Sequence, residues 1–169
     1  MKVLTIEHAI RCTEPEFWDA FLDPEYTTRL FREVLAFPEF EIVHQEESET
    51  EVIRRCVAQP ALGSGQKLML DLFGKPFRFT EEGRFDKHSR TWSWRLEASL
   101  FTAAMRNEGT VRVEPMDGES VRRLTEITLA ADVMVVGPMM EAQAEVRQRD
   151  GWDKSAAFMN EVWLARKPA

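Results

Sequence analysis

Apolar and polar side chains alternate with a period of two along most of this chain, which is the pattern of half-buried β-strands. In residues 3–12 this alternation places His8 on the otherwise apolar face. The pattern therefore predicts a sheet of seven strands. The expected strands are residues 3–12, 39–47, 51–59, 77–86, 90–100, 107–115 and 120–135.

One of these strands, residues 51–59, has a register that its sequence leaves open. Val52 with Cys56 and Ile53 with Val57 each form an apolar pair on one face. Because a shift of one residue exchanges the two faces of a strand, both alternatives stand at this point.

Two short helices are expected between the first two strands. Thr13, Pro15 and Glu16 form a helix start, because a Thr side chain caps the first turn, a Glu three residues later reaches back, and Pro is tolerated early. Asp23 repeats this signal before Pro24 and opens a second helix to about residue 36.

A much longer helix is expected over residues 138–165, after the last strand. Apolar residues recur along it at helical spacing, and we expect this stripe to face the sheet. The stripe consists of Met139, Ala142, Val146, Trp152, Ala156, Met159 and Trp163. A shorter apolar segment, residues 67–73, is too short to be a stable free helix, so it must dock, and a lid over the cavity mouth is one role for it.

The composition is that of a globular protein, with 44% hydrophobic and 30% charged residues among 169, and we expect a single domain, 1–169. The net charge of −7 argues against nucleic acid and against anionic membrane surfaces as main partners.

Other sequence features bear on location and cofactors. No stretch approaches about 18 uncharged apolar residues, so we expect no integral membrane association. The first residues meet charge too early for a secretory signal, and Cys12 and Cys56 are interpreted as buried thiols of a cytoplasmic protein. No metal-ligand spacing, phosphate loop or nucleophile motif is present, so no cofactor and no metal are expected.

The order strand, two helices, six strands and long helix resembles the START-related (SRPBCC, helix-grip) superfamily. Within it, the chain is similar to a bacterial family of unknown function. The segments that carry this resemblance are Glu7-His8, Phe17-Trp18 to Asp23-Pro24, residues 133–141 and residues 161–165. The resemblance implies an α+β fold in which a curved antiparallel sheet grips the C-terminal helix around a cavity. It carries over no catalytic residue.

Strand alternation and the helix stripe predict which side chains would line this cavity. The expected ligand contacts are Phe79, Glu81, Trp92, Trp94, Ile127, Met139, Met140 and Val146. Most are apolar or aromatic, which favours a small hydrophobic molecule such as a lipid, isoprenoid or polyketide.

Two polar residues on apolar faces, His8 and Glu81, are the catalytic candidates. His8 is interpreted either as a proton-transferring group or as a core histidine bonded to a backbone group, and the second is favoured. Glu81 is interpreted either as an acid with a raised pKa or as a side chain that reaches solvent or an arginine. We predict that the two do not form a direct pair.

Three functions follow as hypotheses, and the sequence does not define an oligomeric state. The first is binding or transport of a small hydrophobic ligand. The second is an enzyme of the cyclase, dehydratase or aromatase type that uses His8 or Glu81. The third is an interaction module whose interior is filled by its own side chains.

Overall fold

The computed structural model describes residues 1–61, 63, 67, 70–71 and 74–166. These residues form one antiparallel sheet of seven strands in the order β1-β7-β6-β5-β4-β3-β2, which confirms the predicted sheet. The strands are β1 (Lys2–Ile10), β2 (Glu39–Glu47), β3 (Glu51–Gln59), β4 (Phe79–Asp86), β5 (Thr91–Ala98), β6 (Met105–Pro115) and β7 (Val121–Ala131).

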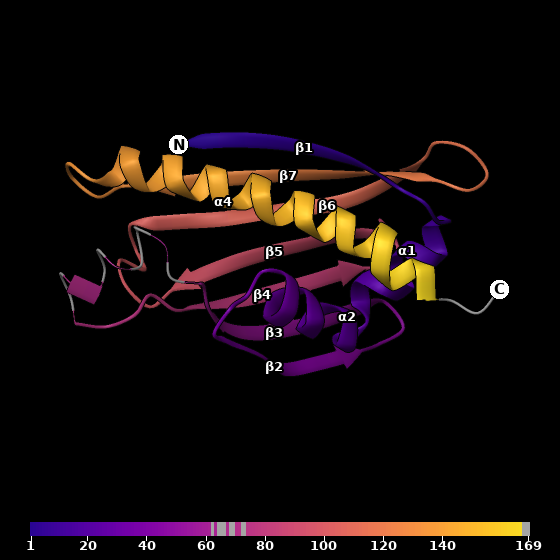
Figure 1. The fold of residues 1–169 in the computed structure, drawn as a ribbon, viewed down its shortest axis with the longest axis horizontal. Coiled ribbons are helices and arrows are strands. Elements are labelled where there is room, and N and C mark those ends of the chain that lie inside the picture. Colours follow the sequence, from indigo (N-terminus) through magenta and orange to yellow (C-terminus); the bar gives the residue numbers. More distant parts are fainter. Residues whose placement is uncertain (62, 64–66, 68–69, 72–73, 167–169) are drawn as a thin grey trace.

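The helices lie where the sequence predicts them. Between β1 and β2 come α1 (Glu14–Leu22), α2 (Pro24–Arg29) and a π-helical turn, η1 (Leu30–Val34). The long helix α4 (Gly137–Phe158) continues through η2 (Met159–Trp163) and η3 (Leu164–Arg166). Figure 1 shows α4 crossing one face of the sheet, from the end where β7 finishes to the end where α1 lies. The lid predicted at residues 67–73 falls largely outside the described residues.

The two expected helix starts are confirmed. The backbone N–H of Thr13 donates to Glu16 Oε2 at 2.9 Å, and the N–H of Glu16 donates to Thr13 Oγ1 at 3.5 Å. Asp23 Oδ1 accepts the N–H of Glu25 at 2.7 Å and that of Tyr26 at 3.4 Å. These bonds satisfy backbone donors that have no partner within the helices.

The last strand is shorter than the predicted residues 120–135, because its neighbours end first. Ala131 of β7 pairs with Met105, where β6 begins, and Leu129 pairs with Lys2 of β1. Residues beyond Ala131 have no strand to bond, so the chain turns before α4 begins. The first strand ends at Ile10 rather than at residue 12.

In β3, the pair Val52 and Cys56 faces inward, which is the first of the two registers that the sequence leaves open. Val52 and Cys56 are buried at 3% and 2% exposure, whereas Ile53 and Val57 are exposed at 40% and 38%. Arg54 lies on the inward face between the two buried residues and is itself only 5% exposed.

The buried apolar residues form two separate clusters. The main one joins the middle of the sheet to α1, α2 and the C-terminal half of α4, and contains Phe17, Trp92 and Met159. The smaller one centres on Phe40, Cys56 and Ala58 at the β2–β3 edge, with partly buried Phe31, Phe37, Ile42 and Phe79 packed against it.

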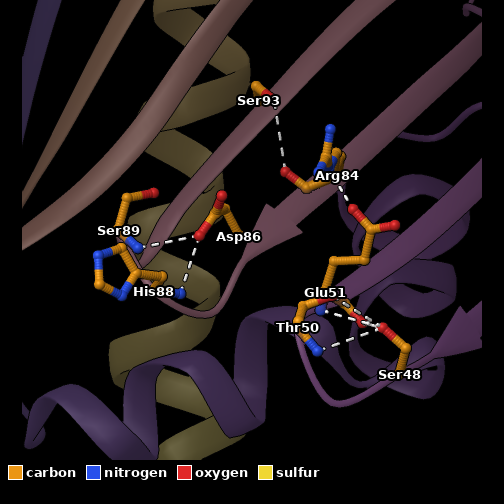
Figure 2. Close-up of polar contacts among 8 residues, drawn as sticks. All are labelled: Ser48, Thr50, Glu51, Arg84, Asp86, His88, Ser89 and Ser93. Carbon is orange, nitrogen blue, oxygen red and sulfur yellow. Dashed lines mark hydrogen bonds and ion pairs between the residues drawn. The ribbon is translucent and has the colours of Figure 1, made fainter.

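Polar side chains close the two hairpin turns near α1. Ser48 Oγ accepts the N–H of Thr50 at 3.3 Å, and Asp86 Oδ1 accepts the N–H of His88 at 2.8 Å and of Ser89 at 2.9 Å. Figure 2 shows these contacts, together with the Glu51–Arg84 ion pair that links β3 to β4 and the bond from Ser93 to the Arg84 carbonyl. His88 contributes its backbone here, so this group of polar residues serves the turns.

The first half of α4 is rotated relative to the prediction. Met139 and Val146 are 43% and 67% exposed, so their predicted inward placement is wrong. In this orientation Glu141 binds the amino group of Met1 at 3.1 Å and Glu145 binds Lys2 at 2.8 Å. Other positions, among them Met140, Ala144 and Gln148, are half-buried instead.

Within the described part of the chain, no helix is both long enough and apolar enough to cross a bilayer.

Candidate functional site

The inward face of the sheet is closed at one end and more open at the other. Toward α1, inward residues such as Trp92, Val111 and Thr125 are at most 2% exposed. Toward the β7–α4 turn, burial is mixed: Ala98 and Leu129 are 8% and 2% exposed, whereas four inward residues of the central strands are half-buried. They are Glu81, Leu96, Met105 and Asn107, and Ala144 and Gln148 of α4 are half-buried too. We call these six residues the inner open surface.

Strand pairing brings three of these residues into one row. Glu81 of β4 pairs with Leu96 of β5, and Leu96 pairs with Asn107 of β6, so their side chains lie on the same face. Neighbouring strands are about 4.8 Å apart, which places Glu81 and Asn107 about 10 Å from each other across the leucine. The row therefore presents an apolar centre between two polar ends.

Glu81 lies between the two apolar clusters. On β4, Phe85 belongs to the main cluster and Phe79 packs on the smaller one, and Glu81 is on the same face between them. An ionisable residue therefore stands on the inward face between the two clusters.

The environment of Glu81 raises its pKa. Burial is the main cause, since it disfavours the charged carboxylate, and the charge of Arg54 opposes the shift. The neighbouring Cys56 thiol has its pKa raised to about 12 by burial and by the charge of Glu81. Glu81 therefore favours the protonated form more than an exposed glutamate does, and a protonated carboxyl can both donate and accept a hydrogen bond.

Arg54 is a buried cation held mainly by neutral groups. Its NH1 donates to Thr27 Oγ1 at 2.8 Å and to the Phe21 carbonyl at 3.4 Å. Its guanidinium carbon lies 4.7 Å from the centre of the Trp92 ring. Among the described residues its Nε has no hydrogen-bond partner. The ring face and two oxygens thus replace the water that an exposed arginine would bind.

An amide pair forms the other polar end of the inner open surface. Trp152 Nε1 donates to Gln148 Oε1 at 3.1 Å, and Gln148 Nε2 donates to Asn107 Oδ1 at 3.5 Å. These two hydrogen bonds orient the Asn107 side chain toward α4 and leave the NH₂ group of Asn107 as a donor.

The predicted aromatic contacts lie mainly in the core. Trp92 and Trp94 are 2% and 6% exposed, and each covers a glycine. A Cβ at Gly83 would overlap the Trp92 ring, and one at Gly109 would lie 2.5 Å from Trp94 Cη2. Ile127 is 1% exposed. Ligand contact by these residues, and by Phe79 and Met140, stays a prediction.

His8 belongs to a different site, at the far end of β1. Its Nε2 lies 2.7 Å from Asp153 Oδ1, and its Nδ1 lies 3.0 Å from NH2 of Arg123. A guanidinium only donates, so Nδ1 accepts and Nε2 carries the proton that is donated to Asp153. Burial lowers the pKa of His8, and the charge of Arg123 lowers it further against the opposing effect of Asp153. His8 is therefore a neutral residue bonded to two side chains rather than to a backbone group.

Arg123 completes this second network. It is 0% exposed, and it donates to Ser155 Oγ at 3.0 Å and to the Trp152 carbonyl at 2.8 Å. Burial lowers its pKa to about 10. Because Arg123 lies on β7 and its partners lie on α4 and β1, the network fastens the helix to the sheet.

The two catalytic candidates do not meet, as predicted. Three strands, β7, β6 and β5, separate β1 from β4, which amounts to about 19 Å across the sheet. His8 also pairs with Arg123, opposite Val113, whereas Glu81 shares a row with Asn107. An acid–base pair of His8 and Glu81 is therefore excluded in this geometry.

Two surface depressions of about 560 and 980 Å³ lie over β2 to β5. Their lining includes outward-pointing side chains such as Arg55 and Glu82 for the first, and Val57 and Thr80 for the second. The first depression lies on the outer face of the sheet. The second is lined from both faces, because the inward residues Phe40, Ala58, Phe79 and Ala98 contribute to it as well. The enclosed cavity expected between sheet and helix stays a prediction.

Four polar residues that matter here were not singled out as site residues from sequence: Arg54, Arg123, Asn107 and Gln148. In the doublets Arg54-Arg55 and Arg122-Arg123, strand alternation sends one residue inward and the other outward. The outward members do pair, Arg55 with Glu82 at 2.7 Å and Arg122 with Glu114 at 3.5 Å. The inward members, Arg54 and Arg123, bond neutral groups. Because the register of residues 51–59 is open in the sequence, the sequence alone does not define which arginine of the first doublet faces inward.

Among the residues that the structure describes, no group of histidine, cysteine and acidic side chains could hold a metal ion.

Comparisons with solved structures show the fold. The chain is similar to the protein TTHA0849 from Thermus thermophilus, with 16% identity, a TM-score of 0.70 and coverage of 99% of this chain and 100% of the other. A START superfamily protein from Mycobacterium smegmatis matches with 11% identity, a TM-score of 0.62 and coverage of 96% and 98%. The Zhui aromatase/cyclase from Streptomyces sp. R1128 matches with 12% identity, a TM-score of 0.57 and coverage of 95% and 98%.

At these identities the likeness carries no residue role. No curated protein matches the sequence significantly. A family model described as "Protein of unknown function (DUF2505)" matches residues 5–164, nearly the whole chain. The chain therefore belongs to this family, and it has the helix-grip fold of the START-related superfamily.

Proposed function

We propose that this protein binds a small, mainly apolar molecule against the inner open surface. The observation that carries the proposal is the change in burial along one face of the sheet. Inward residues are almost fully buried toward α1, whereas Leu96 and Met105 remain half-buried at the other end, although their strands point them inward. Inward apolar side chains that the protein itself leaves partly uncovered favour an apolar ligand.

The mechanism is sequestration. Each Å² of apolar surface removed from water contributes about 25 cal/mol before the cost of ordering the ligand. Leu96, Met105 and Ala144 supply apolar contact, and methionine adapts its shape to different partners. The same physics gives only modest selectivity among apolar molecules of similar size.

Polar groups at the two ends of the row would orient the ligand. Glu81 with its raised pKa suits a hydroxyl or carbonyl group, because a protonated carboxyl donates and accepts. Asn107, held by Gln148, offers an amide donor about 10 Å away. The ligand class that fits is an apolar molecule with one or two neutral oxygen functions.

A neutral fluorescent probe, N-phenyl-1-naphthylamine, tests the proposal. Ala144→Phe places a ring over the inner open surface, and we expect it to weaken probe binding by about tenfold. Ala142→Phe is the matched control, because Ala142 is exposed on the same helix two residues away. Probe binding that is absent in the wild type, or equally affected by both variants, would contradict the proposal and favour an interaction module with a filled interior.

A second candidate, an enzyme of the cyclase or dehydratase type, is favoured by one observation, the raised pKa of Glu81 beside apolar residues. His8 is excluded from the same step by its distance. In this case Glu81→Gln abolishes a pH-dependent turnover and leaves probe binding intact, whereas a carrier shows no turnover to lose.

A further inference from the structure

The turn between β7 and α4 exposes apolar side chains where a folded protein would be expected to hide them. Met134 and Val135 are 92% and 94% exposed, more than any other large apolar residue that the structure describes. Figure 1 shows this turn projecting at one end of the molecule, beyond the sheet.

The backbone of this turn is strained. Val135 has φ of 72°, and the N–H of Val136 donates to the Met134 carbonyl at 2.9 Å, an i→i+2 bond of the γ-turn type. A β-branched residue is a rare occupant of the left-handed region, where glycine or asparagine fits without cost. The chain thus holds a valine outward, in a conformation that valine disfavours.

The apolar exposure continues along α4. Met139, Ala142 and Val146 follow Val135 at intervals of four, three and four residues, so they lie on one side of the helix, and all three are exposed. We call these residues, with Met134 and Val135, the apolar ridge. Three ridge residues, Met139, Ala142 and Val146, belong to the helix stripe that the sequence predicts to face the sheet.

We propose that the apolar ridge docks on the surface of a lipid bilayer made of uncharged lipids. Its shape and size favour this partner over a second protein chain. A stable protein interface buries about 800 Å² on each side, and the Met134–Val135 tip is a narrow projection. A paired helix needs an apolar seam over three or four heptads, and here the seam stops at Val146, since Arg149 and Asp153 take the next positions.

The charges beside the ridge agree with an uncharged lipid surface. Glu141 is paired with the amino group of Met1 at 3.1 Å, and Glu145 is paired with Lys2 at 2.8 Å and with Arg149 at 3.1 Å. The flanks are therefore close to locally neutral in a chain whose net charge is −7. The opposite side of α4 faces the sheet, where Gln148 bonds Asn107, so the ridge is the side of the helix that is free to meet a lipid surface.

The ridge also lies next to the inner open surface. β7 ends at Ala131, which pairs with Met105, and the N–H of Asp132 donates to the Ala104 carbonyl at 2.7 Å. Docking would bring the open end of the grip to the bilayer, so that an apolar ligand could pass between them with little exposure to water. This role for docking rests on the proposed function, whereas the docking itself does not.

Flotation with phosphatidylcholine vesicles tests the proposal. We expect the wild type to float with the vesicles, and the double variant Met134→Asp/Val135→Asp to lose about tenfold in partition or more. Val146→Asp, in the middle of a formed helix, should weaken partition too. The control is Met116→Asp, because Met116 is a 54% exposed apolar residue in the β6–β7 turn, at the other end of the molecule (Figure 1); it should stay within about twofold of the wild type.

Other outcomes overturn the proposal. They are a wild type that does not float, and a loss of partition that is the same for Met116→Asp. A dimer in analytical ultracentrifugation that the double variant dissociates would assign the ridge to a second copy instead. Binding of N-phenyl-1-naphthylamine without vesicles should be unchanged in the double variant, so failed docking and failed ligand binding give different results.

Discussion

The substitution Glu81→Gln removes the buried ionisable group of the inner open surface and keeps its shape. The ordinary glutamate pKa is 4.5, and burial raises that of Glu81 in the folded protein. The folded state therefore holds a proton over a pH range in which the unfolded chain has lost it. As a result, this group makes the free energy of unfolding fall as the pH rises from about 4.5 through the raised pKa.

The pH interval sets an upper limit on the effect. Between the ordinary pKa of 4.5 and pH 7.5 there are three pH units, and at about 1.4 kcal/mol each they limit the cost of Glu81 to about 4 kcal/mol. The charge of Arg54 offsets part of this cost. We expect Glu81→Gln to raise the free energy of unfolding at pH 7.5 by an amount up to this limit, and to have much less effect at pH 5.

Urea unfolding followed by tryptophan fluorescence at pH 5, 6 and 7.5 measures this difference. The matched control is Glu82→Gln, one residue along β4, because Glu82 points outward and pairs with exposed Arg55 at 2.7 Å. An exposed pair is worth at most about 1 kcal/mol, with little dependence on pH above 5. If Glu81→Gln behaved like this control, the argument that Glu81 is desolvated inside the grip would be refuted.

Three further predictions concern stability. The lowered pKa of His8 means that the folded state resists protonation, so the free energy of unfolding should drop as the pH falls below about 6.5, by up to about 1.4 kcal/mol at pH 5.5, and His8→Gln should flatten this drop. Val135→Gly should stabilise the protein by about 1 kcal/mol in urea unfolding while it weakens vesicle binding, because it relieves the positive φ and removes an apolar side chain; a loss of stability would contradict the strain. Gly83→Ala should lower the free energy of unfolding, measured by thermal unfolding, by about 1–3 kcal/mol, because its methyl group would overlap the Trp92 ring. Gly151→Ala should raise it by about 1 kcal/mol, because the space around Gly151 is open. Equal effects of the two variants would contradict the tight packing of Trp92 on Gly83.

Element order and strand alternation were sufficient to predict the fold. The capping residues Thr13 and Asp23 define both short helices, and local hydrogen bonds of this kind can be inferred from neighbours in the sequence. The end of β7 could not be inferred, because it depends on where β1 and β6 stop offering partners.

The inner open surface was predictable only in part. Alternation placed Glu81 on an inward face, which the shared row with Leu96 and Asn107 agrees with. The rotation of α4 was not predictable, since an apolar stripe indicates that a helix has a distinct side and not which neighbour that side meets. Here Ala144 and Gln148 face the sheet, and Met139 and Val146 point outward beside the ion pairs of Glu141 and Glu145.

The most direct test of ligand binding at the inner open surface is a nuclear magnetic resonance titration of the ¹⁵N-labelled protein with N-phenyl-1-naphthylamine. We predict that the amide signals of Leu96, Met105 and Asn107 shift together and saturate with a single dissociation constant. Outward residues of the same strands, such as Arg95 and Arg106, should shift less. Shifts confined to the outer face around Arg55 and Arg95, or no saturable shift at all, would contradict the account.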